Sequence, residues 1–168
     1  EFTFNGEEVI VIANHFNSKG GDQPIFGKNQ PPFLGSEAQR VEIAGIVNNF
    51  IKDVKSKNAD ANVVVLGDLN DFEFSNPLTT LKGNELTNLI EKVPAADRFT
   101  YNYQGNSQVL DHLLVTNNLA EKSEIDIVHL NSPFTEAHGR VSDHDAIFAQ
   151  LDLSSKVEPK PLDLTIMH

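Results

Sequence analysis

The chain contains no cysteine, and no run of about 18 apolar residues occurs among its 168 residues. The absence of cysteine excludes disulfides, zinc sites built on thiolates and a thiol nucleophile, although it does not decide the compartment. The absence of a long apolar run means that no segment could span a membrane. The first residues also lack the pattern of a secretory signal peptide.

Positive charge is scarce as well, because 13 lysines and arginines stand against 24 acidic residues, which gives a net charge of −11. A protein that coats nucleic acid makes its phosphate contacts with Lys and Arg and is therefore basic. Binding of nucleic acid by bulk charge is excluded. Two possibilities stay open: the protein does not touch nucleic acid, or its carboxylates gather metal ions that face a phosphate.

Hydrophobic residues make up 39% of the chain, which is enough for one domain with its own core. We expect this domain to cover residues 1–153. The remaining residues, 154–168, contain proline and lysine and are predicted to form a linker or a loosely docked tail. Glu1–Phe4 resembles the middle of a strand, so we expect the chain to be part of a longer protein.

The first elements are predicted from apolar runs and turn residues. Strands at Phe2–Phe4 and Glu8–Ala13 flank Asn5-Gly6, a strong hairpin signal. The second strand shows no polar alternation, so we expect it to be buried on both faces. Ser18–Gly35 is rich in glycine and proline and is predicted to be a long loop, of the kind that is usually functional or mobile.

A helix is predicted over Glu37–Lys57, with Ser36 as N-cap and Gln39 as its capping-box partner. The other expected elements are strands at Val63–Leu66, Phe99–Tyr103, Val109–Thr116, Ile125–Leu130 and Ala146–Leu153, a turn at Gly105-Asn106, and a short helix plus loop over Pro77–Ile90. Strand segments outnumber helices, which indicates an α+β fold with a mixed, mostly antiparallel sheet.

Polar side chains gather where apolar strands end, and the shared rim of such strands is where binding sites form. The residues concerned are Asn14 and His15, Asp68 and Asn70, and Asp143 and His144. Each pair is ambiguous by itself. His15 alone is better explained as a half-buried histidine that binds backbone at a strand end.

Asp68 and Asn70 are two residues apart, so on an extended backbone their side chains would point to the same side. A carboxylate next to an amide suits a hard cation and a phosphate oxygen. Taken alone, however, the pair is better explained by an Asx turn after the strand, because Asp and Asn favour turns.

His144 is a natural proton carrier near neutral pH. Its neighbour Asp143 would point away from it on a strand, so the orienting acid must come from elsewhere, and Asp143 would be free to bind a metal. Asp111 is the candidate, because it lies within an apolar strand and a buried carboxylate needs a partner. A purely structural Asp–His pair is the alternative. His112 faces the opposite side and is predicted to be a structural residue or to lie at the rim.

Most scattered basic residues are simply solvated. The candidates for phosphate contact are Lys19, Lys28, Arg40, Arg98 and Arg140. Only Arg140 stands out, because it lies close to Asp143 in the sequence, and we expect it to bind substrate. His129 and His138 are assigned to the surface or to loops.

The order and chemistry of these clusters resemble the last four motifs of the endonuclease/exonuclease/phosphatase superfamily, also called deoxyribonuclease-I-like. Gly67–Phe72 (GDLNDF) and Ser142–Asp145 (SDHD) are the most specific segments. Asn14–Gly20 (NHFNSKG) and Gln108–His112 (QVLDH) are more similar still to secreted bacterial extracellular nucleases. The resemblance runs from about Val9 to Leu153 and implies the C-terminal part of a four-layer α/β/β/α sandwich.

The resemblance implies metal-dependent hydrolysis of phosphodiester bonds in DNA or RNA by in-line attack of water. His15 would be the general acid, and Asp111 would orient His144, the base. The resemblance also assigns metal contacts to Asp68, Asn70 and Asp143, and it assigns substrate contacts to Asn14 and Asn70. Mg²⁺ is the expected metal, with Ca²⁺ or Mn²⁺ as alternatives, because the ligands are all oxygen.

Family members also have an Asn and a metal-binding Glu about half a domain before the histidine motif, and neither has a match in this chain. The acid expected to pair with His15 would lie there too. We therefore expect a missing N-terminal half of the domain, and an exposed apolar sheet face that leads to self-association or is covered by that half. The alternative functions are a phosphatase or sphingomyelinase-like phosphodiesterase, or a catalytically incomplete binding module. An extracellular or periplasmic location is expected from the resemblance.

Overall fold

The computed structural model describes residues 1–153, and the tail predicted at 154–168 lies outside these residues. No helix in the described part of the chain is long and apolar enough to cross a membrane. The strands are β1 (Phe2–Phe4), β2 (Glu7–His15), β3 (Asn62–Asp68), β4 (Leu86–Asn88), β5 (Tyr101–Tyr103), β6 (Asn106–Gln108), β7 (Asp111–Thr116), β8 (Ser123–Val128) and β9 (Ala146–Leu151). The helices are α1 (Glu37–Lys57), α2 (Asn76–Lys82) and α3 (Asn117–Ala120), with 3₁₀ turns η1 (Leu89–Lys92) and η2 (Glu136–His138).

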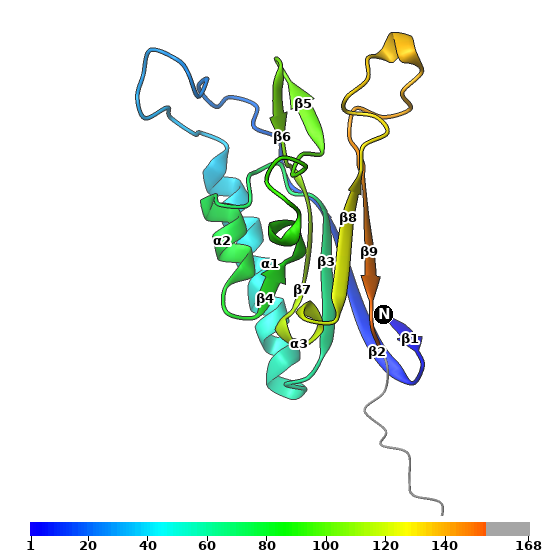
Figure 1. The fold of residues 1–168 in the computed structure, drawn as a ribbon. Coiled ribbons are helices and arrows are strands. Elements are labelled where there is room, and N and C mark those ends of the chain that lie inside the picture. The colour runs from blue at the N-terminus through cyan, green and yellow to red at the C-terminus, as the bar shows by residue number, and fades with distance from the viewer. Residues whose placement is uncertain (154–168) are drawn as a thin grey trace, which may run out of the picture.

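The main sheet has five strands in the order β1-β2-β3-β7-β4. Only β2 and β3 run parallel, and every other pair in this sheet is antiparallel. Helices α1 and α2 cover one face of the sheet, and the two-stranded sheet β8–β9 lies on the other face (Figure 1). The predicted α+β fold with a mixed, mostly antiparallel sheet is confirmed.

Side-chain alternation along the central strands divides the core into two parts. Val63 and Val65 of β3 belong to the same apolar cluster as Ile51 of α1. Val64, between them, belongs to the cluster on the opposite face, against which Ile147 of β9 packs. The face on which a side chain lies therefore decides whether it meets the helices or the second sheet, and this rule also places the polar residues at the strand ends.

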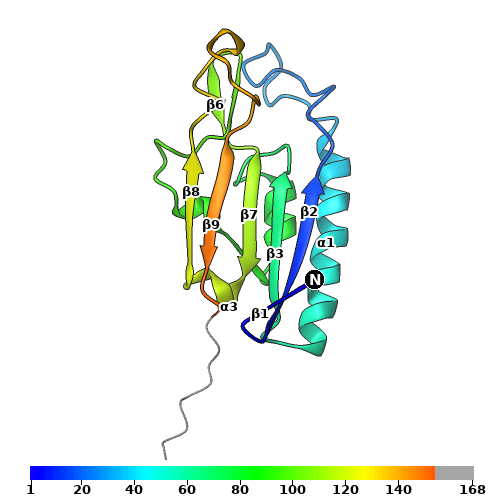
Figure 2. The ribbon, with the colours of Figure 1, turned by 90° about the vertical axis from the view of Figure 1, so that its right-hand side faces the viewer.

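The predicted N-terminal hairpin is confirmed, because β1 pairs antiparallel with β2 around Asn5 and Gly6, which have φ values of 51° and 82°. The prediction that the second strand is buried on both faces is wrong. Its Val11 is 37% exposed, because β8 and β9 lie over the β7 side of the sheet and leave the β2 side open (Figure 2). Phe2 and Phe4 are also exposed, so the expected apolar surface is present, and self-association stays a prediction.

Helix α1 begins at the predicted residue but without the predicted capping box. Ser36 makes no side-chain cap, and its backbone is αR, with φ −84° and ψ −16°. Its hydroxyl donates to Oδ1 of Asp22 at 2.8 Å and accepts from Nη1 of Arg40 at 2.6 Å. The hydroxyl is therefore taken by a buried ion-pair network, which is why Gln39 has no cap to complete.

Other boundaries also differ from the predictions. The predicted loop after α2 contains strand β4, which pairs with β7 at the sheet edge. The β5–β6 turn lies at Gln104-Gly105, with φ values of 49° and 79°, one residue before the predicted Gly105-Asn106. In addition, the predicted strand Val109–Thr116 begins only at Asp111.

Gly67 has a specific structural role in β3. It has a φ of 131° and pairs with Asn14 of the parallel strand β2. A Cβ atom added at Gly67 would lie 1.9 Å from the backbone oxygen of Asn14. Only glycine permits the two backbones to approach this closely, immediately before Asp68.

We expect Gly67→Ala to destabilise the protein by about 3 kcal/mol or more, because the residue would be strained and would push β2 away from β3. Gly45→Ala in α1 is the control. Its Cβ would come no nearer than 4.0 Å to Cγ2 of Thr80, so the better helix former should stabilise the fold by about 0.5–1 kcal/mol. Urea unfolding measures both effects, and equal stability of the two variants would contradict the close approach.

Candidate active site

Three adjacent strands place His15, Asp68 and Asp111 side by side at one edge of the main sheet. His15 pairs with Asp68 across β2 and β3, and Asp68 pairs with Asp111 across β3 and β7. Neighbouring strands lie about 4.8 Å apart. By alternation from Val64, Asp68 faces away from the helices. The row formed by His15, Asp68 and Asp111 therefore lies on the side of the second sheet.

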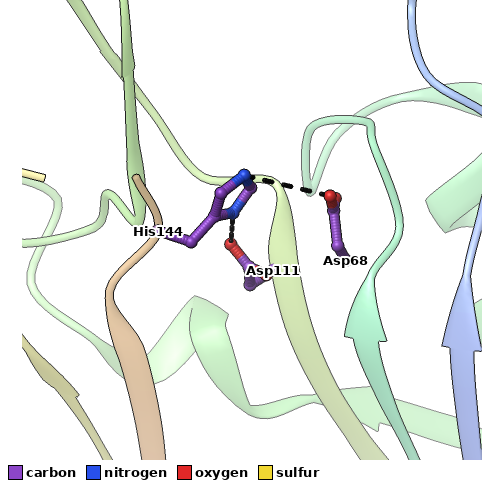
Figure 3. Close-up of side chains that lie close together, drawn as sticks. All are labelled: Asp68, Asp111 and His144. Atoms are coloured by element: carbon purple, nitrogen blue, oxygen red, sulfur yellow. Dashed lines mark hydrogen bonds and ion pairs between the residues drawn. The ribbon is translucent and has the colours of Figure 1, made fainter. Parts of the chain in front are cut away.

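His144 reaches this row from the loop before β9. Its Nδ1 lies 2.6 Å from Oδ2 of Asp111, and its Nε2 lies 4.0 Å from Oδ2 of Asp68 (Figure 3). The predicted pairing of Asp111 with His144 is therefore present in the structure. Because the carboxylate accepts the Nδ1 proton, the neutral ring presents Nε2 as an acceptor toward Asp68.

The hydrogen bond that Nδ1 of His144 donates to Asp111 raises the pKa of His144 above its ordinary value of 6.5. Burial opposes this shift, while the charges of Asp111, Asp68 and Asp143 add to it. A stronger base at this position suits proton abstraction near neutral pH.

Asp68 and Asn70 lie together, but the backbone between them is not extended as the prediction assumed. Asn70 has a φ of 52°, and its backbone N–H donates to Oδ1 of Asp68 at 2.9 Å, which is an Asx turn. The side-chain amide donates to Oδ2 of Asp68 at 3.2 Å and to the backbone oxygen of Phe16 at 3.0 Å. Nδ2 of Asn70 thus donates to both Asp68 and Phe16, and the amide oxygen points away from these two partners.

Burial raises the pKa of Asp68 above 3.8, and the charge of Asp111 raises it further. The hydrogen bond from Asn70 and the charges of His144 and His15 oppose the shift. Nε2 of His15 lies 3.4 Å from Oδ2 of Asp68, although the imidazole is 78% exposed. The Asp68 carboxylate thus lies between two imidazoles.

Asp145 fixes the loop that carries His144, a role that the sequence did not reveal. It is buried, and its Oδ1 accepts hydrogen bonds from the backbone N–H groups of Asn131 and Ser132 at 2.8 and 2.9 Å. Its Oδ2 accepts from the Ser132 hydroxyl and lies 3.0 Å from Nδ1 of His129. Burial alone would raise the pKa of Asp145, but these hydrogen bonds outweigh burial and lower it.

Thr100 and Tyr101 connect this loop to Asp111. The buried Thr100 hydroxyl accepts from the backbone N–H groups of Leu110 and Asp111, and its carbonyl accepts from the backbone N–H of Asp145 at 2.8 Å. The ring of Tyr101 stacks on the His144 ring with centroids 4.6 Å apart. Thr100 therefore holds both segments that carry the Asp111–His144 pair. A buried threonine next to an aromatic residue is too common a pattern to have predicted this role.

A buried ion-pair network supports the segment that carries Asp68. Nε of Arg40 donates to Oδ2 of Asp71 at 2.9 Å, and Nζ of Lys19 lies 2.5 Å from Oδ1. Arg40, which is wholly buried, also donates to the backbone oxygens of Asn17 and Ser18. Arg40 and Lys19 are thus structural in this protein rather than open phosphate contacts.

Some predicted residues are not brought into the row. The Asn14 amide donates to the backbone oxygen of Ile12 at 3.1 Å, and Asp143 is exposed. Nη1 of Arg140 donates to the backbone oxygen of Phe134. Their roles in metal and substrate binding stay predictions.

The other histidines are placed as follows. His112 is buried between the Asn88 side chain and the backbone oxygen of Asp71, and burial lowers its pKa, so the predicted structural role is confirmed. His129, predicted to lie at the surface or in a loop, lies in the loop after β8 and is half buried against Phe99 and Asp145. His138 is exposed in the loop before β9, as predicted.

Asp68, Asp111 and His144 each offer an atom to a group that could hold a metal ion, because these atoms all lie within 4.8 Å of one another. Asp111 is already committed to His144, so Asp68 is the carboxylate of the group that is free to act as a ligand. The amide oxygen of Asn70 is a second oxygen donor beside it. Mg²⁺ is commonly held by one or two carboxylates with waters and substrate phosphates, and this donor set fits that chemistry.

Residues 1–150 match the sequence model of the Endonuclease/Exonuclease/phosphatase family. The chain belongs to this family, which confirms the predicted resemblance. No curated protein matches the chain.

Solved structures show the same fold. Truncated Caenorhabditis elegans TDP2 is 19% identical with a TM-score of 0.65, and the match covers 89% of this chain and 56% of that one. The Bacteroides thetaiotaomicron mannosyl-6-phosphatase Bt3783 is 17% identical with a TM-score of 0.54 (88% and 52% covered). Sphingomyelinase C from Streptomyces griseocarneus is 21% identical with a TM-score of 0.51 (90% and 52% covered). The chain thus spans little more than half the length of these proteins.

We expect His144 of the metal-free protein to titrate above 6.5 in an NMR pH titration, because the Asp111 carboxylate stabilises the imidazolium. Asp111→Asn should lower the pKa of His144, since the neutral amide stabilises the charged ring less. Asp53→Asn is the control, because it removes an exposed carboxylate of α1 that is paired with Lys57. If His144 titrates at the same pH in wild type and Asp111→Asn, the pairing is not the cause of the shift.

Proposed function

We propose that this protein hydrolyses phosphodiester bonds by in-line attack of water, with His144 as the general base. The observation that carries this proposal is the Asp111–His144 hydrogen bond of 2.6 Å, which leaves Nε2 facing Asp68 at 4.0 Å. A proton acceptor and a charged oxygen donor therefore converge on one place, where a water and a phosphate could lie together.

In the proposed reaction, Nε2 of His144 takes a proton from the attacking water, and Asp111 stabilises the imidazolium that forms. His15, on the other side of Asp68, donates a proton to the departing oxygen. Its high exposure leaves the ring accessible to a substrate bound at the sheet edge. The two imidazoles flank Asp68, as in-line displacement requires of a base and an acid on opposite sides of the phosphorus.

Asp68 and Asn70 would hold a divalent cation, with the exposed Asp143 as a further donor. When bound, Mg²⁺ would neutralise charge on the phosphate oxygens. Mn²⁺ or Ca²⁺ could bind the same oxygen donors.

Nucleic acid is the substrate class that we propose. Support comes from the segments Asn14–Gly20 and Gln108–His112, which resemble secreted bacterial extracellular nucleases. The same resemblance makes an extracellular or periplasmic location part of the proposal. Because the net charge is −11, the phosphate must be bound by a cation and by local contacts rather than by the overall field of the protein.

We expect the full-length protein to hydrolyse bis(p-nitrophenyl) phosphate and plasmid DNA in the presence of Mg²⁺. His144→Ala and Asp68→Ala should each lower kcat/KM by at least about 100-fold, since proton transfer by a placed side chain contributes about 10²–10⁴-fold. His138→Ala, which removes an exposed histidine of the same loop, should retain activity. Parallel assays with sphingomyelin and a sugar phosphate test the other substrate classes. Full activity of His144→Ala would exclude this base.

Binding of Mn²⁺ to the full-length protein, followed by calorimetry or electron paramagnetic resonance, tests the metal site without turnover. We expect Asp68→Asn to weaken binding by at least about 10-fold, because it removes the partly buried charge of the donor set. Asp143→Asn, which removes an exposed carboxylate, should weaken binding less. Unchanged binding by Asp68→Asn would remove Asp68 from the metal site.

A further inference from the structure

The β5–β6 hairpin carries a series of aromatic rings that begins at His144. The ring of Tyr101 stacks on the ring of His144, with centroids 4.6 Å apart and 29° between the planes. The backbones of these two residues also form a β-bridge. Tyr103 lies two residues along β5, on the same face as Tyr101, and the two tyrosine rings stack with centroids 6.5 Å apart and 15° between the planes. The rings therefore lead from the reacting group toward the tip of the hairpin.

The outer ring of this series is open to solvent. Tyr103 is 52% exposed, whereas Tyr101 is partly buried. The hairpin extends beyond the main sheet at the end where the strands carry His15 and Asp68 (Figures 1 and 2). A ring in this position adds little to the core, so its open face is available to a ligand that also reaches His144.

The hairpin is uncharged, although the chain has a net charge of −11. None of residues 99–110 is acidic or basic, and the polar side chains among them are hydroxyls and amides. A strand of phosphates therefore meets no carboxylate of this segment, and the repulsion from more distant carboxylates is weaker. Stacking of a base on a neutral ring also needs no positive charge, of which this chain has little.

We propose that Tyr103 stacks on the unpaired base of a nucleotide next to the scissile phosphodiester, and that this contact favours nucleic acid as the substrate. The proposal rests on the proposed function, because it takes His144 as the base of the reaction. Every nucleobase offers a planar π face that matches an exposed aromatic ring. A lipid chain has no such face and would be bound equally well by an aliphatic side chain.

Binding of two fluorescein-labelled single strands to the full-length protein, measured by anisotropy, isolates the contact with a base. One strand is a phosphorothioate oligothymidylate, and the other has the same backbone without bases. Loss of one stacked base lowers affinity by about 5- to 150-fold. We expect Tyr103→Ala to lower the affinity for the oligothymidylate by this factor and to leave the affinity for the abasic strand unchanged.

Matched variants separate the ring from its apolar surface. Tyr103→Phe should bind the oligothymidylate like wild type, because stacking needs the ring and not the hydroxyl. Tyr103→Leu keeps an apolar side chain without a π face and should bind like Tyr103→Ala. Phe148→Ala is the control, because it removes a ring of β9 that is 61% exposed and pairs with Asp126 of β8, and it should change neither affinity. Wild-type affinity of Tyr103→Leu would indicate a general apolar contact and overturn the stacking proposal.

Hydrolysis of bis(p-nitrophenyl) phosphate by the wild-type protein separates the stacking proposal from the proposed function. If this diester is hydrolysed but Tyr103→Ala binds the oligothymidylate like wild type, the stacking proposal is overturned and the function stands. The same conclusion follows if the wild type binds both strands equally. If Tyr103→Ala loses affinity for the oligothymidylate alone but the diester is not hydrolysed, the base contact stands and the proposed reaction fails. An equal loss of affinity for both strands would assign Tyr103 to the fold of the hairpin and overturn the stacking proposal.

Discussion

The hydrogen bond between Asp111 and His144 is the interaction on which the site depends, because it joins the two sheets. Asp111 begins β7 in the main sheet, while His144 precedes β9 in the second sheet. A carboxylate here would be costly without a partner, and an imidazole here would have no fixed orientation without an acid. The pairing gives the Asp111 carboxylate a partner and fixes the orientation of the His144 ring. The hydrogen bonds of Thr100 with Asp111 and Asp145 hold the two segments that carry the pair in position.

The charges around Asp68 explain how an acidic protein could hold a phosphate. Asp68 lies between the rings of His15 and His144, and burial raises its pKa. Such a carboxylate gains more from a bound cation than an exposed one would, because water screens its charge less. Acidic residues elsewhere on the surface then need not prevent binding of a phosphate at this site, because the charges that act on it most strongly are the nearest ones.

Much of the fold and of the site could be predicted from the sequence. The N-terminal hairpin, α1 and the pairing of Asp111 with His144 follow from local patterns and from the cost of a buried charge. The burial of β2 could not be predicted, because it depends on which part of the sheet β8 and β9 cover. The capping of α1 was missed for a similar reason: Arg40 competes for the Ser36 hydroxyl, and its partner Asp71 is distant in the sequence. Asp145 was missed because its partners lie 13 to 16 residues earlier, at the start of the segment between β8 and β9.

Arg40 holds the segment between β2 and α1 at both of its ends. Arg40 binds the backbone at Asn17 and Ser18, where the segment leaves β2, and the hydroxyl of Ser36, where it enters α1. Both ends are thus fastened to one side chain, and closing a longer loop between fixed ends costs only about 0.6 kcal/mol per doubling of its length. Insertions, deletions and even a proteolytic cut between the two anchors would leave His15 and Asp68 in place. The length and sequence of this segment can therefore change while the residues of the candidate site stay where they are.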